Sequence, residues 1–268
     1  CVEGTAERHA SKNQRKKSRQ PSDIARIEKE SEADIKGFFF AAAAGFQPHG
    51  LQGLLIEKIY STYKLADIQK GYPSKQERIV IAKNAENTAT QLYEHFKNGL
   101  SALENKQYDV AIELFTKANS QVPFRENWNN IGVAYARKAL ALKVSSKAEI
   151  ENPARFLYPL EVENKSRLLN ERTRSLDDTT EEIIELLNHA QSAFEKALQL
   201  DPSFYKSRIN LACVYDLQGK HNSAIAEITE KLPEEARASK ETKIILAIAY
   251  YNADMEEKAE MIWGELKM

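Results

Sequence analysis

A recurring spacing of small and aromatic residues is the feature that most constrains how this chain folds. From residue 99 onward, small residues recur with aromatic residues between them, and a proline closes each full unit. Small residues let two helices approach closely and aromatic side chains fill the gaps, so each unit predicts a helical hairpin. One hairpin cannot bury its apolar face alone, so the units are expected to stack. The first unit carries the pattern at Gly99, Tyr108, Ala111, Phe115, Ala118 and Pro123.

This spacing is typical of tetratricopeptide repeats, and we expect about four of them in residues 91–268. The stretch "WNNIGVAY", residues 128–135, has the first-helix signature of the second repeat. Its second-helix signature is expected at residue 144, but "AQSAFEKALQLDP" places the matching Ala190 46 residues later. We therefore expect an insertion at residues 143–180, between the two helices of one repeat. The third and fourth repeats lie in "NLACVYDLQGKHNSAIAEI" and "LAIAYYNADMEEKAEMIWGEL".

The concave face of such an array is the candidate binding surface. Stacked repeats present first-helix side chains there, and the surface holds an extended peptide or a partner's helix. Polar donors on it can hold a peptide backbone or a carboxylate, although plain solvation of a helix face is the alternative. The expected partner is a protein or peptide. The candidate peptide-binding residues are Asn129, Asn130, Arg137, Lys206 and Asn210.

The insertion contains a compact apolar cluster that is costly to leave exposed. We expect it to fold back onto the solenoid or into its groove. Plugging the groove and building a new binding loop are both open from the sequence. The cluster consists of Phe156, Leu157, Tyr158, Pro159 and Leu160.

The composition of the chain limits which other classes of function are expected. The chain has 268 residues, a net charge of -1 and 42% hydrophobic residues, which allows roughly two units. No apolar stretch approaches the roughly 20 residues that a membrane-spanning helix needs. Residues 1–22 form a basic arm without aromatic residues, which we interpret as disordered, and no nucleic-acid partner is expected.

The two cysteines do not suggest a disulfide framework. Cys213 lies in the apolar helical pattern "INLACVYDL" and behaves as a small hydrophobic residue. Cys1 stands where a methionine usually begins a chain. The sequence is therefore either a fragment of a longer reading frame or a mature lipoprotein, in which case an acylated Cys1 gives its membrane contact.

The N-terminal third also predicts helices, so the expected fold class is all-α. We expect helices at about 23–44 and 49–64, and then a long helix at 75–104 that couples the N-terminal unit rigidly to the repeats. Ser74 and Glu77 form a capping box at its start. The expected apolar face of the second helix consists of Leu51, Leu54, Leu55, Lys58 and Ile59.

A pair of carboxylates on the first helix is ambiguous by itself. Glu30 and Asp34 are four residues apart and lie on one helix face. Their repulsion is a few tenths of a kcal/mol and the helix dipole offsets part of it, so a solvated helix start explains them.

The longer pattern changes that interpretation. The stretch "ESEADIKGFFFAAAAGFQP", followed by "LLIEKIY" and "GYPSKQERI", resembles the C-terminal half of the catalytic domain of HtpX-like zinc metallopeptidases. That group includes the prenyl-protein (CAAX) proteases and the periplasmic BepA type, and several members carry tetratricopeptide repeats. The resemblance covers about residues 25–82 within a unit at 23–90. It implies that Glu30 is a zinc ligand and that Asp34 orients it.

The chain departs from that family at the decisive motif. Such a hydrolase needs H-E-x-x-H, and none of the 5 histidines is followed by glutamate or paired at i, i+4. Tyr72 also stands where many relatives have histidine. The site is incomplete, the chain alone is predicted to be inactive, and zinc is expected only if the missing segment is supplied. Truncation and degeneration both fit.

The combined expectation is an interaction module attached to a truncated or degenerate metallopeptidase domain. The resemblance implies bacterial cell-envelope protein quality control or assembly, and hence the periplasm or cell envelope, with the cytoplasm as the other location. The alternative function is a non-catalytic lipoprotein scaffold anchored through Cys1.

Overall fold

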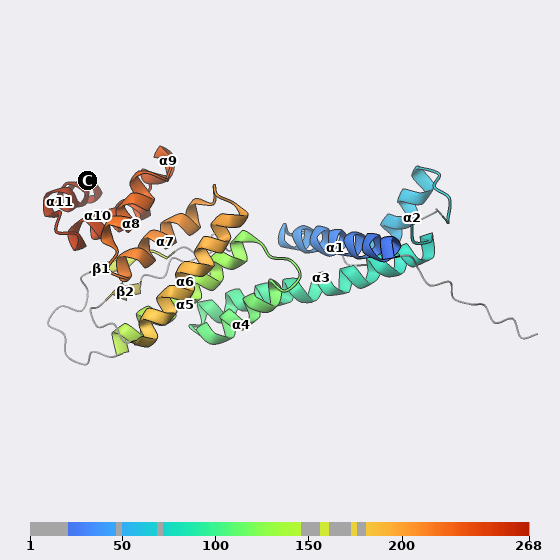
Figure 1. Ribbon diagram of the computed structural model, residues 1–268, viewed down its shortest axis with the longest axis horizontal. Coiled ribbons are helices and arrows are strands. Elements are labelled where there is room, and N and C mark those ends of the chain that lie inside the picture. Colours follow the sequence, from blue (N-terminus) through green and yellow to red (C-terminus); the bar gives the residue numbers. More distant parts are fainter. Residues whose placement is uncertain are drawn as a thin grey trace, which may run out of the picture.

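The computed structural model describes residues 21–46, 50–68, 72–145, 156–160, 173–175 and 181–267. Helices dominate these residues, and the all-α prediction is confirmed for them. The molecule is elongated, with α1 and α2 near one end and the C-terminus at the other (Figure 1). Cys1 and the rest of residues 1–20 lie outside the described residues, as do the gaps within the insertion.

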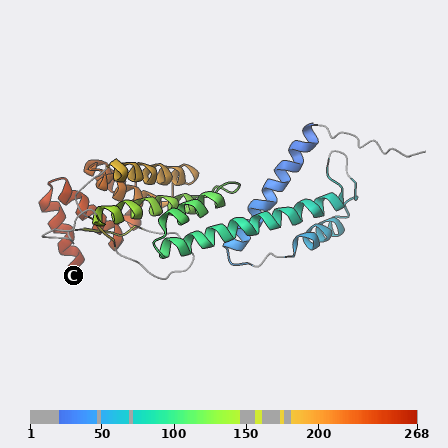
Figure 2. The same ribbon diagram turned by 90° about the horizontal axis from the view of Figure 1, so that it is seen from below.

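The N-terminal unit consists of α1 (Pro21–Ala43) and α2 (Gln52–Thr62), which both pack against α3 (Lys75–Glu104). Figure 2 shows α1 crossing the long α3 rod while α2 lies beside its first turns. The predicted capping box is confirmed, because the Ser74 hydroxyl accepts from the Glu77 N–H and the Glu77 carboxylate accepts from the Ser74 N–H. Helix α3 then runs unbroken for 30 residues into the repeats.

The predicted apolar face of α2 is wrong for its three leucines, whereas Ile59 does pack against the buried cluster between α2 and α3. Leu51, Leu54 and Leu55 are 53%, 61% and 48% exposed. The face that packs against α3 instead contains Gln52 and Ile56, which are four residues apart and buried. The reason is tertiary, since the chain enters α2 from Gly50, which has a positive φ and donates its N–H to the Glu86 carboxylate of α3. This fixed entry turns the leucines outward.

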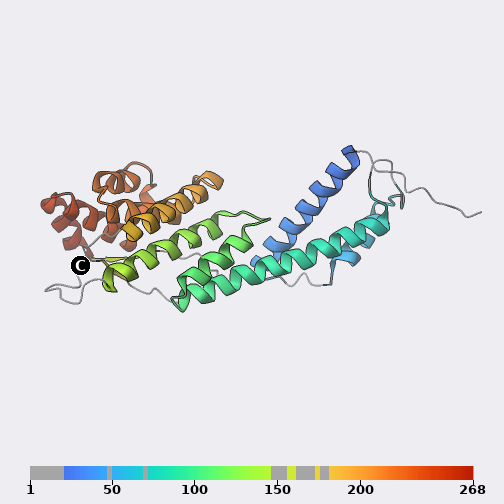
Figure 3. The same cartoon turned by 60° about the horizontal axis from the view of Figure 1, so that its bottom comes forward.

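The repeat array begins in the last turns of α3 and continues to the C-terminal helix. Hairpins form from α3 with α4, α5 with α6, α7 with α8, and α10 with α11, and they stack in chain order (Figure 3). The short α9 lies in the connection between the last two hairpins along the chain. The array helices are α4 (Tyr108–Ala118), α5 (Arg125–Ser145), α6 (Glu181–Leu200), α7 (Tyr205–Leu217), α8 (His221–Thr229), α9 (Glu234–Arg237), α10 (Lys240–Asn252) and α11 (Glu256–Lys267).

The buried core is nearly continuous along the molecule. One large cluster runs through the array from α3 to α10. A second surrounds Phe39 between α1, α3 and the loop before α5, and a third lies between α2 and α3. Phe96 of α3 packs against both the first and the second cluster, so it joins the N-terminal unit to the array.

The insertion contributes two short strands that the sequence analysis does not predict. β1 (Phe156–Tyr158) and β2 (Thr173–Ser175) pair antiparallel, with Phe156 opposite Ser175. β2 contacts α5 and β1 contacts α10. The insertion therefore folds back onto first helices of the array. None of the helices in the described part of the chain is both long and apolar enough to cross a membrane.

Candidate functional site

Each of the first two hairpins closes around a glycine and a phenylalanine. A Cβ built on Gly132 of α5 would lie 2.6 Å from the Phe194 ring of α6, and one on Gly99 would lie 2.7 Å from the Phe115 ring of α4. Real Cβ atoms do not approach that closely, so only glycine allows the ring to lie against the helix backbone. Gly132 and Phe194 thus pack as one repeat although 61 residues separate them in the sequence.

A buried polar network joins the second and third repeats. The Asn129 side-chain carbonyl on α5 accepts hydrogen bonds from the Ser207 hydroxyl at 2.9 Å and from the Asn210 amide at 3.0 Å, both on α7. The Asn129 amide donates to the Asn130 carbonyl at 3.4 Å. All four residues have 0% exposure. Because buried amides need such partners, this network fixes the spacing of neighbouring first helices.

The five predicted peptide-binding residues therefore fall into two groups. Asn129, Asn130 and Asn210 are inside the array, whereas Arg137 and Lys206 are partly exposed. The structure brings the asparagines together but does not present them to solvent. The binding role of all five residues stays a prediction. The sequence indicates them because they lie on first helices, and that position does not distinguish a side chain that bonds to the next repeat from one that is exposed to solvent.

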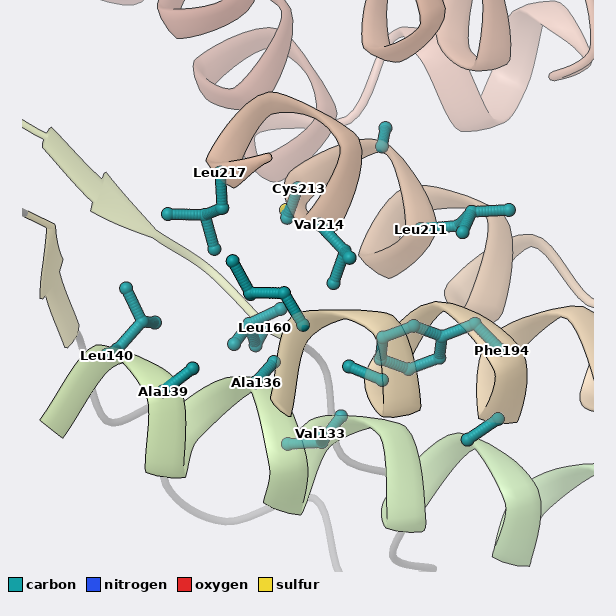
Figure 4. Close-up of a cluster of buried hydrophobic side chains, with 14 of the residues drawn as sticks. Val133, Ala136, Ala139, Leu140, Leu160, Phe194, Leu211, Cys213, Val214 and Leu217 are labelled. Carbon is teal, nitrogen blue, oxygen red and sulfur yellow. The ribbon is translucent and has the colours of Figure 1, made fainter. Parts of the chain in front are cut away.

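The insertion supplies a residue to the same region. Leu160 is 5% exposed and belongs to the large core cluster. Figure 4 shows its side chain between Ala136 of α5 and Val214 and Leu217 of α7. Its backbone carbonyl accepts from the Arg137 guanidinium at 3.5 Å. Leu160 thus fills the space between two first helices.

A second polar contact between repeats was not predicted. Asp216 of α7 has a fully buried side chain that lies 2.6 Å from the His221 ring of α8 and accepts from the Asn252 amide of α10 at 2.8 Å. Beside it on α7, burial and the nearby carboxylates of Glu195 and Glu227 raise the pKa of Tyr215. The hydrogen bond between Asn252 and Asp216 therefore joins the third and fourth repeats, while Glu195 approaches Tyr215 from α6 of the second repeat.

The acidic pair of α1 lies against an arginine of α3. Arg78 Nε is 2.5 Å from the Glu30 carboxylate, and its two terminal nitrogens lie 2.5 and 3.1 Å from the Asp34 carboxylate. Burial alone lowers the pKa of Arg78, but the hydrogen bond to Asp34 and the charges of both carboxylates raise it overall. The guanidinium is therefore a permanent counter-charge for the pair.

The described residues do not fit a zinc ion. In that part of the chain, no three histidine, cysteine, aspartate or glutamate side chains are grouped as a metal site requires. Glu30 instead pairs with a cation, which competes with a metal for the same oxygen lone pairs. The arginine comes from "GYPSKQERI", so the structure brings together the acidic pair and one of the other stretches on which the resemblance rests.

Comparison with known families identifies the repeats. The model of the tetratricopeptide repeat family matches residues 193–226, which cover the end of α6, α7 and the start of α8. No curated protein matches the chain. The repeat part of the prediction is confirmed by this match, and it supports a protein-interaction module.

Proposed function

We propose that this chain captures a partner protein or peptide on the first-helix face of its tetratricopeptide array, in the service of an HtpX-like metallopeptidase domain. The observation that carries the binding role is the repeat match together with the stacked hairpins. Solenoids of this kind bind along an extended surface that no single repeat provides.

The metallopeptidase part rests on the resemblance and on two features of the N-terminal unit. Arg78 links the acidic pair to the element that follows it in the family pattern. The unit also exposes large apolar side chains, including Phe46 at 72%, Leu54 at 61% and Ile68 at 80%. We propose that further protein covers these exposed apolar side chains. The proposed location is the periplasm or cell envelope, and the rival proposal is a lipoprotein scaffold anchored through Cys1.

Site-specific photo-crosslinking tests the binding role. A photoreactive amino acid replaces Lys206 on α7, and the matched control replaces Glu185 on α6, whose side chain is 74% exposed. We expect one discrete adduct from position 206, and none from position 185, because the partner lies along first helices. Adducts of equal yield from both positions, or from neither, would refute the proposed binding face.

Zinc content tests the metallopeptidase part. This chain is expected to retain less than about one tenth of an equivalent of zinc after dialysis, because one carboxylate paired with Arg78 offers too few ligands. Stoichiometric zinc that resists dialysis would contradict the incomplete site. The sequence upstream of Cys1 separates the two proposals, since an H-E-x-x-H motif there supports the peptidase and a signal segment ending at Cys1 supports the lipoprotein.

A further inference from the structure

We infer that residues 156–160 act as an intramolecular ligand of the array, and that a partner peptide binds by replacing them between α5 and α7. This inference deepens the proposed function and rests on it. It names the binding position, and it identifies the partner as an extended segment with an apolar side chain next to a proline.

The other hairpins of the array show that the insertion is not needed to close a repeat. Their two helices are joined by three-residue loops, at 105–107, 218–220 and 253–255. The middle residue of each loop has a positive φ, at Lys106, Gly219 and Asp254. The second repeat packs through Gly132 and Phe194 like the first, yet its helices are connected through a long insertion. Helix pairing therefore does not explain why this repeat contains the additional residues.

The contacts of the insertion are those of a docked peptide. β1 and β2 form a ribbon of two three-residue strands, and in the described part of the chain it joins no larger sheet. A lone two-stranded ribbon is marginally stable, so its position depends on what it touches. The Leu160 side chain lies between α5 and α7 (Figure 4), and the Arg137 guanidinium donates a hydrogen bond to the Leu160 backbone carbonyl. An apolar anchor with a backbone hydrogen bond is how extended peptides are recognised.

The occupant defines what the site accepts. Pro159 is half-buried and precedes the buried Leu160. Proline restricts the backbone before the anchor and lowers the entropy lost on binding. The site between Ala136 and Leu217 is lined by apolar groups, and Arg137 at its edge favours a carbonyl or a terminal carboxylate. The partner is therefore an extended peptide with a Pro-Leu-like step.

A tethered occupant weakens the binding of any competitor. The effective concentration of the tethered occupant is on the order of millimolar. The apparent dissociation constant of a free peptide equals its intrinsic value divided by the fraction of molecules whose site is open. For an occupant with an intrinsic dissociation constant of about 0.1 mM, the apparent dissociation constant of the free peptide rises about tenfold.

Peptide binding to three versions of the full chain tests the inference. The probe is a fluorescein-labelled peptide Phe-Leu-Tyr-Pro-Leu with blocked ends, followed by anisotropy. The versions are the wild type, Leu160→Ala, and a variant in which residues 146–180 are replaced by the Gln-Gly-Lys loop of residues 218–220. We expect both variants to bind the probe about tenfold more tightly than the wild type. Arg137→Met in the loop-replacement variant is expected to weaken binding at least fivefold.

The controls separate competition from loss of folding. Leu200→Ala removes a leucine that is 50% exposed and is expected to leave probe affinity at the wild-type value. The loop-replacement variant is compared with the wild type by circular dichroism and by cooperative unfolding. Equal probe affinity for all versions, or no binding to a folded loop-replacement variant, would overturn the inference. If crosslinking from position 206 persisted in that case, the proposed function would stand without the intramolecular ligand.

Discussion

Two glycines show how a single residue determines a helix pair in this array. Gly99 and Gly132 each face a fully buried phenylalanine ring at a distance that leaves no room for a methyl group. Glycine inside a helix costs about 1 kcal/mol relative to alanine. The packing of the ring against the helix backbone offsets that cost, and so the glycine is a packing residue and not a flexible point.

The variant Gly132→Ala measures this packing. It gains helix propensity but forces the Phe194 ring to move, so we expect the free energy of unfolding to fall by about 1–3 kcal/mol. The matched control is Gly264→Ala on α11, where a new Cβ has no neighbour within 4 Å. That variant is expected to gain up to about 1 kcal/mol. Urea denaturation measures both, and equal shifts of the same sign would contradict the packing argument.

The buried hydrogen bonds of Asn129 give it a structural role in the array. Asn129→Ala leaves the Ser207 hydroxyl and the Asn210 amide without this buried acceptor, and the expected loss of stability is about 1–3 kcal/mol. Asn188→Ala, which removes an exposed acceptor of Gln218, is expected to cost less than about 0.5 kcal/mol. Thermal unfolding compares the two. A stable Asn129→Ala protein with weakened partner capture would assign the residue to binding instead.

At the scale of elements, ion pairs and loops decide how helices meet. Arg78 attaches α1 to α3 through two carboxylates, and all three side chains are at most 30% exposed. Exposed pairs such as Lys36 with Glu32, at 42% and 59%, contribute far less because water screens them. An ion pair that joins two helices and is shielded from water therefore contributes more to stability than an exposed pair within one helix.

The variant Arg78→Met tests that difference. It leaves Glu30 and Asp34 facing each other without a counter-charge, so we expect a loss of about 2–3 kcal/mol and faster hydrogen exchange in α1. Lys36→Met is the control and is expected to change stability by less than about 0.5 kcal/mol. Adding Glu30→Gln and Asp34→Asn to Arg78→Met should recover part of the loss. An unchanged α1 exchange rate would show that the apolar contacts of α1, including Ile35 and Phe39, hold the helix without the ion pairs.

At the scale of the molecule, Phe96 connects the two units. Its ring centroid lies 6.5 Å from Phe39, 6.0 Å from Phe115 and 5.3 Å from Phe124, so aromatic rings from α1, α4 and the loop before α5 meet on α3. Together with the unbroken α3, this contact explains why the N-terminal unit and the array share one axis (Figure 1).

The variant Phe96→Ala is expected to uncouple the units. We predict a loss of about 2–4 kcal/mol, since the partly buried ring leaves a cavity between two clusters. Hydrogen exchange should then accelerate in α1 and α4 together. Phe40→Ala, at a ring that is 48% exposed, serves as the control and is expected to affect α1 alone. Unchanged exchange in α4 would mean that the array folds without this contact.

Local chemistry made much of the fold predictable. The Ser74 capping box and the positions of the repeats depend on residues a few places apart, and the structure has them as expected. The face of α2 and the burial of Asn129 were not predictable, because each depends on a partner more than 25 residues away. The sequence thus predicted which residues contribute to the candidate site, but it did not predict which of them are buried.

The sequence by itself determined the long helices and the stacking of the repeats, because small and aromatic residues at a fixed spacing pair neighbouring helices. Only the tertiary structure decided what the polar and inserted residues do. It placed Arg78 against Glu30 and Asp34, and it placed Leu160 between α5 and α7. A buried charge or apolar side chain is stable only beside a suitable partner. The sequence shows the need for that partner, but only the folded chain shows which distant segment supplies it.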